Sequence, residues 1–296
     1  MDIKAKLVLD EFMELGEGPC WDEIEQALYW VDTDFKRVHK YCPYVGSKEE
    51  YQLEQKIGAV VKEGTDTLIC AMENGFYRIS QRDGSREFLC DPEVDKPDNL
   101  FNDGKCDKYG RFWAGTMNRN EIKNQGTLYI LNSDNRCEPR LENVTISNGI
   151  AWTEDYQTMY YIDTATYKVV AFDYDIEHGA ICNKRIVIEF DPGLGMPDGM
   201  TIDENGNLWI AMWGGACVLH CNPSKGEIIK KVELPVSNVT SCTFGGKDLD
   251  ILYITTARAE LSEEERKAQP YAGGLFQAQV STKGFPSNRF GKNFKG

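Results

Sequence analysis

A short strand pattern recurs six times along this chain of 296 residues. Each copy is an apolar, aromatic-rich run that follows turn residues, and the copies are Leu28–Asp32, Leu68–Ala71, Phe112–Gly115, Tyr160–Asp163, Leu208–Ala211 and Leu252–Thr255. The central residues of successive copies, from Trp30 to Tyr253, are 39, 44, 48, 48 and 44 positions apart. A period of roughly 20–50 residues is typical of solenoids, propellers and other repeat architectures. This repeat constrains the fold more than any single motif does.

A second run with strand character follows each copy, and no part of the chain shows a sustained helical period of apolar residues. The second runs are Arg37–Tyr44, Gly75–Ser80, Gly126–Leu131, Lys168–Tyr174, Ala216–Cys221 and Gly273–Val280. The best helical candidate is Ser262–Gln269, where Ser262 and Glu265 match a capping box and Pro270 ends the segment. We therefore expect a chain built almost entirely of β-strands.

The number of β units predicts an all-β fold, a six-bladed β-propeller with four-stranded antiparallel blades around a central channel. Residues 1–296 would form this single domain. A β-sandwich needs roughly 7–9 strands, whereas the six units offer about two dozen. The early segment Leu7–Leu9 is expected to supply the outer strand of the last blade, so that the two termini close one blade together.

The charge balance excludes two kinds of partner. The chain has 33 Lys and Arg against 47 Asp and Glu, a formal net charge of −14, whereas nucleic acids and anionic membranes attract an excess of positive charge.

Apolar runs such as Ile57–Val61 are too short to span a bilayer. The N-terminus lacks the apolar segment of a secretory signal, and the ten cysteines include no Cys-x-x-Cys pair. We expect a cytoplasmic, monomeric protein with reduced cysteines and a small-molecule substrate.

Oxygen-bearing side chains occupy one phase of the repeat in four of the six units. Counting back 11 to 13 residues from the central residue reaches Glu17, Asn102, Asn148 and Asp198, each followed by glycine directly or after Asp103. A single Asn-Gly or Asp-Gly pair usually indicates a turn, because both residues tolerate positive φ. However, simple turns would not be expected to occur at the same position of several repeats, where the chain enters the innermost strand. The pattern therefore predicts a convergent site beside the channel.

The types of side chain indicate what this site would bind. Only three histidines are present, none at a metal-ligand spacing from another, so histidine-rich zinc chemistry is not expected. Carboxylate and amide oxygens suit hard cations such as Ca²⁺, Mg²⁺ or Mn²⁺. Glu17, Asn148 and Asp198 would supply three protein ligands and leave positions open for water or substrate. Such an open site favours catalysis over a purely structural metal.

At these residues the sequence resembles the regucalcin/gluconolactonase/luciferin-regenerating-enzyme family of six-bladed propellers, over nearly the whole chain. The motifs that carry the resemblance are Gly16–Pro19, Asn102–Lys105, Gly110–Met117, Ile146–Trp152, Tyr160–Asp163, Pro197–Met200 and Thr240–Gly246. The resemblance implies one divalent cation on Glu17, Asn148 and Asp198, with Ca²⁺ first and Mg²⁺, Mn²⁺ or Zn²⁺ as alternatives. It also implies that Asn102 and Asp103 face the substrate and that Asp198 acts as the base.

Two departures from the family pattern bear on substrate recognition. The lactonases of the family usually carry arginine two residues before the asparagine, and this chain has Leu100 there. Leucine cannot replace the bidentate donor of a guanidinium group. The loop after Met117, residues Asn118–Asn124, is also shorter than the corresponding lid of vertebrate members, and Glu121 on this loop is a candidate substrate contact.

The sequence thus predicts a divalent-metal-dependent hydrolase that acts on a sugar lactone or a similar small ester. Two alternatives stay open. Leu100 favours a Ca²⁺-binding regulatory protein with little or no catalysis. An organophosphate-type hydrolase is the other alternative, because propellers with similar sites cleave phosphorus esters.

Overall fold

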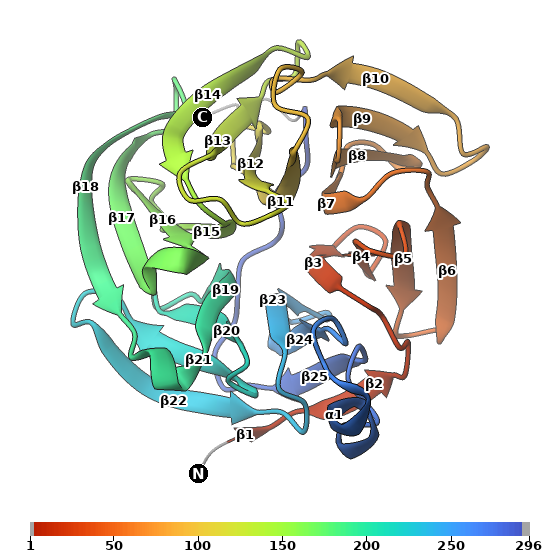
Figure 1. Ribbon diagram of the computed structural model, residues 1–296, viewed down its shortest axis with the longest axis vertical. Helices are drawn as coiled ribbons and strands as arrows, with labels where there is room; N and C mark the ends of the chain where they lie inside the picture. Colours follow the sequence, from red (N-terminus) through yellow and green to blue (C-terminus); the bar gives the residue numbers. More distant parts are fainter. Residues whose placement is uncertain (1–2, 292–296) are drawn as a thin grey trace.

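Six β-sheets stand around a central axis like the blades of a propeller (Figure 1). The structure is a computed structural model, and it describes residues 3–291. In the first five blades, four consecutive antiparallel strands run from the centre of the ring to its rim. The predicted six-bladed propeller is therefore confirmed.

The strands of the first three blades follow the chain in order. Blade 1 contains β3 (Gly16–Asp22), β4 (Ala27–Asp32), β5 (Arg37–Cys42) and β6 (Ser47–Gln52). Blade 2 contains β7 (Ile57–Lys62), β8 (Thr67–Met72), β9 (Gly75–Ser80) and β10 (Arg86–Cys90). Blade 3 contains β11 (Asn99–Cys106), β12 (Phe112–Asn118), β13 (Gly126–Leu131) and β14 (Cys137–Val144).

The next two blades continue the same order, with a short 3₁₀-helix in each. Blade 4 contains β15 (Ser147–Trp152), β16 (Thr158–Asp163), the 3₁₀-helix Thr164–Thr166, β17 (Lys168–Asp175) and β18 (Ala180–Glu189). A second 3₁₀-helix, Pro192–Leu194, leads into blade 5. Blade 5 contains β19 (Met196–Ile202), β20 (Leu208–Trp213), β21 (Cys217–Asn222) and β22 (Glu227–Glu233).

Blade 6 is assembled from both ends of the described chain. It contains β23 (Val239–Gly245), β24 (Ile251–Thr256), β25 (Leu275–Gln279) and, as its outer strand, β2 (Lys6–Leu9), which pairs antiparallel with β25. The two-residue strand β1 (Ile3–Lys4) pairs in parallel with β22 and extends blade 5. Val8 and Leu9 pack against a core cluster that includes Trp21, Trp30 and Leu275. The N-terminal strands therefore tie blades 5 and 6 to blade 1.

Aromatic side chains of the repeat fill the blades. Trp30, Trp113, Tyr161, Trp209 and Tyr253, the central residues of five copies, are all buried. Burial of such large rings contributes much of the stability of a β-core. The ten cysteines form no disulfide.

Helical structure is a minor part of the described chain. The α-helix α1 (Glu263–Ala268) begins at Ser262 with the predicted capping box, in which the Ser262 side chain accepts from the amide of Glu265. Pro270 follows shortly after the helix end. Within residues 3–291, no helix has the length and apolar character that crossing a membrane requires.

Every innermost strand contains a β-bulge at the same level of the channel. The register against the next strand shifts between Glu17 and Cys20, Ile57 and Ala59, Phe101 and Asp103, Ser147 and Ile150, Pro197 and Met200, and Val239 and Ser241. A bulge leaves a residue unpaired and can re-aim its side chain. The six bulges therefore form a ring of irregular backbone around the axis.

Two aspartates hold the segments that lead into this ring. The carboxylate of Asp32 accepts from the amides of Glu14 and Leu15, at 3.2 and 3.3 Å. In blade 4, Asp163 accepts from the amides of Thr145 and Ile146, both at 3.0 Å. Each aspartate ends the second strand of its blade and fixes the chain just before the bulge of the first strand.

The segment after β25 crosses the centre of the ring in Figure 1 and bonds to strands on its far side. The amide of Gly284 donates to Leu249 O in blade 6, and the amide of Phe290 donates to Lys62 O in blade 2, both at 2.8 Å. Asn288 donates to Cys106 O in blade 3 at 3.2 Å. This C-terminal segment therefore covers the end of the channel where the innermost strands finish.

Deletion of residues 1–10, which removes both β1 and β2, should lower the thermal unfolding temperature by at least about 5 °C, because blade 6 would lose its outer strand and its packing on Trp21. Deletion of residues 1–5 removes β1 only and serves as the matched control, for which we expect a much smaller change. Differential scanning calorimetry measures both. Equal unfolding temperatures for the full chain and the 1–10 deletion would show that β2 does not close the ring.

Candidate metal and active site

Five of the polar side chains that the sequence singled out lie at the ring of bulges. Glu17 comes from blade 1, Asn102 and Asp103 from blade 3, Asn148 from blade 4 and Asp198 from blade 5. Glu17, Asp103, Asn148 and Asp198 are only 4–7% exposed. Asn102, Asn148 and Asp198 are unpaired residues within their bulges. Glu17 is paired with the neighbouring strand directly before its bulge, and it has a longer side chain.

Hydrogen bonds connect three blades at this level. The Asn102 amide group donates to Ser147 O at 2.8 Å and to Asn148 Oδ1 at 3.2 Å. Asn148 Nδ2 in turn donates to Thr164 Oγ1 at 2.8 Å, and this hydroxyl donates to Pro197 O at 2.8 Å. This chain of bonds fixes the orientation of the Asn148 amide, with its oxygen on the side of Asn102. Sequence reasoning missed Thr164, because a single threonine after a strand carries no distinguishing signal.

Three carboxylates approach one another at the same place. Burial, and secondarily the charges of Asp198 and Asp103, raise the pKa of Glu17 well above its ordinary value. Burial and the charge of Asp103 likewise raise the pKa of Asp198 well above its ordinary value. The pKa of Asp103 is raised by burial, while Lys105 and the Gly104 amide act in the opposite direction. A positive charge bound among the three groups would favour their ionised forms.

One atom of this cluster has no partner among the described residues. Asp198 Oδ1 is fully buried and accepts no hydrogen bond. A buried carboxylate oxygen without a hydrogen-bond donor is costly unless a cation satisfies it. Glu17, Asn148 and Asp198 offer oxygen atoms only, as hard divalent cations prefer. The residues present therefore fit a divalent cation of this kind.

Two glycines allow the innermost strands to come this close. A Cβ atom on Gly199 would lie 2.0 Å from Ser241 Oγ of blade 6, and one on Gly149 would lie 2.8 Å from Asp198 O. Neither glycine has the positive φ of a turn glycine. The Asn-Gly and Asp-Gly pairs at these positions are therefore sites of close strand packing and not turns.

The sequence was then compared with known families and proteins. Residues 15–258 match the family described as SMP-30/Gluconolactonase/LRE-like region. The chain belongs to this family. A Bacillus subtilis (strain 168) protein, YvrE, named as a candidate sugar lactone lactonase, is 42% identical over 281 residues, which cover 95% of this chain and 96% of that protein. Regucalcin of Xenopus laevis is 38% identical over 281 residues, covering 93% of this chain and 94% of regucalcin.

Solved structures of two SMP-30/gluconolactonase relatives share the whole fold. A luciferin-regenerating enzyme superposes with a TM-score of 0.91 at 30% identity, covering 97% of this chain and 99% of that one. A structure described as a calcium-binding protein, regucalcin from Agrobacterium tumefaciens strain C58, superposes with a TM-score of 0.93 at 25% identity, covering 98% of each chain. The family resemblance seen in the sequence motifs is therefore confirmed.

The two remaining candidate residues are Leu100 and Glu121. Leu100 is half-buried on β11, paired with Met117, and lines a hollow between blades 2 and 3 together with Glu73 and Asn74. Glu121 is exposed on the loop between β12 and β13, where its amide donates to Asn118 O at 2.8 Å. Within residues 3–291, neither side chain makes a hydrogen bond to the five residues at the bulges.

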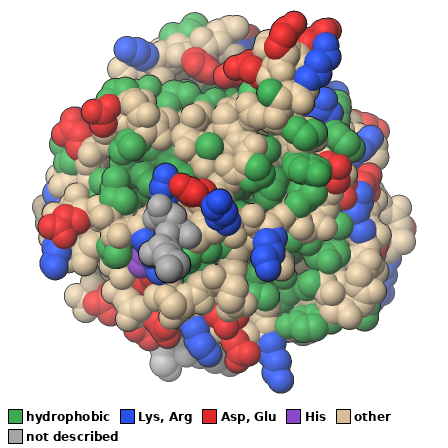
Figure 2. Space-filling view, turned by 90° about the horizontal axis from the view of Figure 1, so that it is seen from below, with side chains coloured by type: hydrophobic (Ala, Val, Ile, Leu, Met, Phe, Trp, Pro, Cys, Tyr) green, Lys and Arg blue, Asp and Glu red, His purple; other side chains and the backbone are tan. Residues whose placement is uncertain are grey.

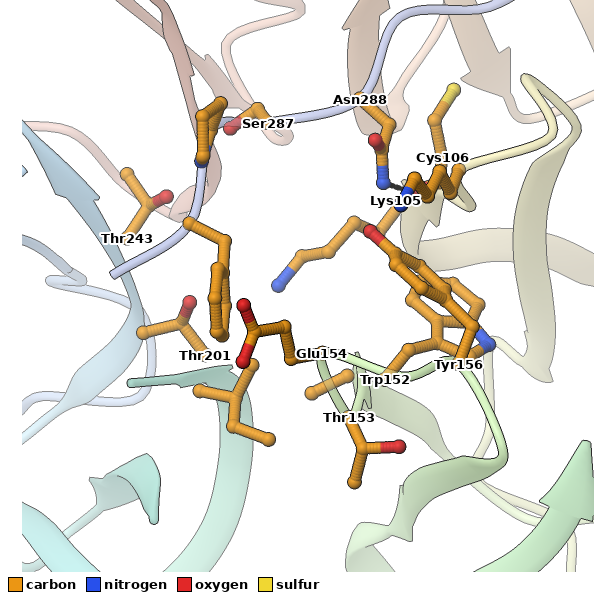
Figure 3. Close-up of a pocket in the computed structure, with 15 residues that line it drawn as sticks. Lys105, Cys106, Trp152, Thr153, Glu154, Tyr156, Thr201, Thr243, Ser287 and Asn288 are labelled. Atoms are coloured by element: carbon orange, nitrogen blue, oxygen red, sulfur yellow. Dashed lines mark hydrogen bonds between the residues drawn. The ribbon is translucent and has the colours of Figure 1, made fainter. Parts of the chain in front are cut away.

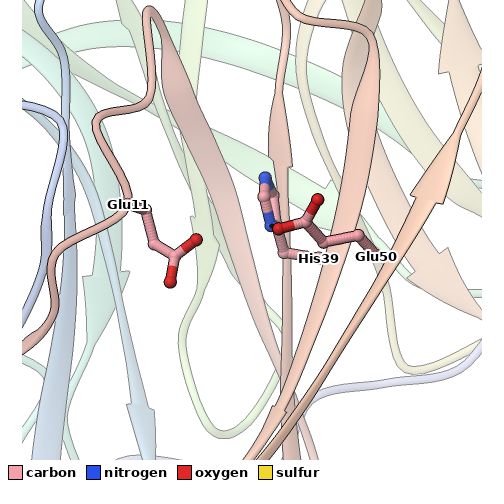
Figure 4. Close-up of side chains that lie close together, drawn as sticks. All are labelled: Glu11, His39 and Glu50. Atoms are coloured by element: carbon pink, nitrogen blue, oxygen red, sulfur yellow. Dashed lines mark ion pairs between the residues drawn. The ribbon is translucent and has the colours of Figure 1, made fainter.

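A second group of possible metal ligands lies at the rim of blade 1 (Figure 4). Oxygen and nitrogen atoms of Glu11, His39 and Glu50 come within 4.8 Å of one another, although these residues are far apart in the sequence. The ammonium group of Lys48 pairs with both Glu11 and Glu50. Both carboxylates therefore already have a cationic partner, and we assign no metal to the group.

The raised pKa values predict how pH affects stability. An acidic group with a raised pKa in the folded state stabilises the protein at low pH, and this contribution is lost as pH rises from about 4 through the folded-state pKa. In chelator-treated protein, the cluster should therefore destabilise the fold increasingly toward neutral pH. Ca²⁺ at about 100 times its Kd should raise the free energy of unfolding by about 2.7 kcal/mol.

Thermal unfolding at several pH values, with Ca²⁺ and with chelator, measures this effect. We expect the difference between the two unfolding temperatures to grow as pH rises. The variant Asp198→Asn should show a smaller difference with a weaker pH dependence, because one titrating ligand is gone. A Ca²⁺ effect that is the same at all pH values would contradict the role of these carboxylates.

Proposed function

We propose that this protein is a divalent-metal-dependent hydrolase that acts on a sugar lactone or a similar small ester. The observation that carries the proposal is the convergence of Glu17, Asp103 and Asp198, all buried, beside the Asn148 amide. Membership of the SMP-30/gluconolactonase family, with a relative named as a candidate sugar lactone lactonase, supports the substrate class.

Glu17, Asn148 and Asp198 would hold the cation. When bound, a divalent cation supplies Lewis-acid polarisation of a carbonyl oxygen and stabilises the developing oxyanion. Ca²⁺ is the first candidate, since a structural relative is described as a calcium-binding protein. Mg²⁺, Mn²⁺ and Zn²⁺ are the alternatives to test.

Asp198 would move the proton. Its carboxylate has two oxygens, so one can hold the cation while the other accepts a hydrogen bond from a water molecule. As the water oxygen bonds to the carbonyl carbon, its proton passes to this carboxylate. The ring carbon–oxygen bond then breaks, and the proton goes to the departing ring oxygen. The product is a hydroxy acid.

Asn102 and Asp103 would orient the substrate. The nitrogen of the Asn102 side chain is fully engaged with Ser147 and Asn148, so its position is fixed and its oxygen remains available to a substrate hydroxyl. Asp103 Oδ1 accepts from the Gly104 amide at 2.7 Å, which leaves the other oxygen as an acceptor. Both residues therefore offer acceptors for substrate hydroxyl groups.

The variant Asp198→Asn should lower kcat for a lactone by at least about 100-fold, because amide nitrogen and oxygen cannot take the proton from water. A panel of lactones, assayed with Ca²⁺, Mg²⁺, Mn²⁺ and Zn²⁺ in turn, measures the change. Glu227→Gln, on the exposed outer strand β22, is the control and should retain full activity. Unchanged turnover in Asp198→Asn would rule out this role for the residue.

One observation favours a second function, that of a Ca²⁺-binding regulatory protein. Leu100 offers no donor where family lactonases carry arginine, and several relatives are named regucalcin. If this function is correct, calorimetry should detect Ca²⁺ binding, and the protein should hydrolyse no lactone with any of the four metals. Including a phosphotriester in the same panel tests organophosphate hydrolysis.

A further inference from the structure

A pocket of about 330 Å³ opens where the innermost strands finish, at the other end of the channel from the bulges (Figure 3). Its walls come from the ends of β11, β15 and β19, from the loop between β15 and β16, from β23 and from the C-terminal segment. The lining includes Lys105, Trp152, Glu154, Tyr156, Thr243 and Phe285. This volume is sufficient for a small organic ligand.

Lys105 projects its amino group into this pocket (Figure 3). In the described chain, its single hydrogen bond goes to Met200 O, at 2.8 Å, and it takes part in no ion pair. An ammonium group has three N–H donors. The side chain is half-buried, and Asp103 acts on it only from a distance that is too long for an ion pair. Two donors at the pocket therefore remain without an acceptor among residues 3–291.

Lys62 is a buried lysine whose amino group is compensated by an ion pair and hydrogen bonds within the protein. Its amino group pairs with Glu25 at 2.8 Å and donates to Thr65 O at 2.6 Å and to Gln81 Oε1 at 2.7 Å. It also lies over the ring of Tyr29. Lys105 has none of this compensation, so packing alone does not account for its place at the pocket.

Lys105 brings a positive charge to this pocket in a protein of net charge −14. Among the residues that line the pocket, Glu154 supplies the one carboxylate. Aromatic rings form much of the wall, and the Lys108 amino group lies 4.9 Å from the centroid of the Tyr156 ring. A cavity that combines free donors of an ammonium group with apolar walls favours a ligand that has one negative charge and a flat apolar body.

We propose that this pocket binds a small organic monocarboxylate. The ligand carboxylate accepts from Lys105 Nζ in a charge-assisted hydrogen bond, and the apolar body packs against Trp152, Tyr156 and Phe285. Glu154 also lines the pocket, where its carboxylate weakens binding by repelling that of the ligand. The residues that line this pocket include none of the five polar residues at the bulges, and the proposal does not depend on the hydrolase proposed above.

Isothermal titration calorimetry of the full chain with benzoate, at low salt, tests this site. We expect millimolar or tighter binding, at least tenfold weaker binding in Lys105→Met, and several-fold tighter binding in Glu154→Gln. The two variants should change the affinity for benzoate in opposite directions, and this distinguishes a contact between Lys105 and the ligand from a structural role of Lys105. Lys184→Met, on the exposed strand β18, is the control for overall charge and should bind as the native chain does.

Sulfate and Asp198→Asn provide the remaining controls. Sulfate should bind more weakly than benzoate, because it lacks the apolar body, and Asp198→Asn should bind benzoate normally. The proposal is overturned if benzoate gives no heat, if sulfate binds equally well, or if Asp198→Asn abolishes binding. Should Lys105→Met fail to fold, Glu154→Gln decides, because unchanged or weaker binding in that exposed-residue variant contradicts the proposal.

Discussion

Close approach of six strands around one axis is the constraint on which the site depends. Neighbouring blades come close together near the axis, and at the bulges their innermost strands leave no room for a Cβ atom at two positions. Gly149 and Gly199 meet this requirement, since a Cβ atom on either would collide with the next blade. The bulge beside each glycine then turns a polar side chain toward the channel. Packing and chemistry therefore use the same few residues.

The repeat was sufficient to predict the propeller and the second and third strands of each blade. The predicted runs Gly75–Ser80 and Gly126–Leu131 are strands with those bounds. The phase argument also brought Glu17, Asn148 and Asp198 to one level, because a repeat places equivalent residues at equivalent heights. The interpretation of the glycines was incomplete, because a turn glycine and a close-packing glycine look the same in a sequence.

Contacts between distant parts of the chain were not predictable in this way. The bond from Lys105 to Met200 joins residues 95 positions apart. The bonds that place Thr164 between Asn148 and Pro197 likewise depend on how blades 4 and 5 meet. Neither interaction follows from a period, a spacing or a residue type. Both require the angle between neighbouring blades, which only the three-dimensional structure provides.

The closed end of the ring has a consequence for how molecules enter and leave. The C-terminal segment spans that end, and the space inside the ring between Gly18 and Ser287 is only about 20 Å³. That is room for about one water molecule. A substrate would therefore not pass through this end of the ring. In the proposed hydrolase, substrate would enter and product would leave at the same end, so the product would have to leave before the next substrate could bind.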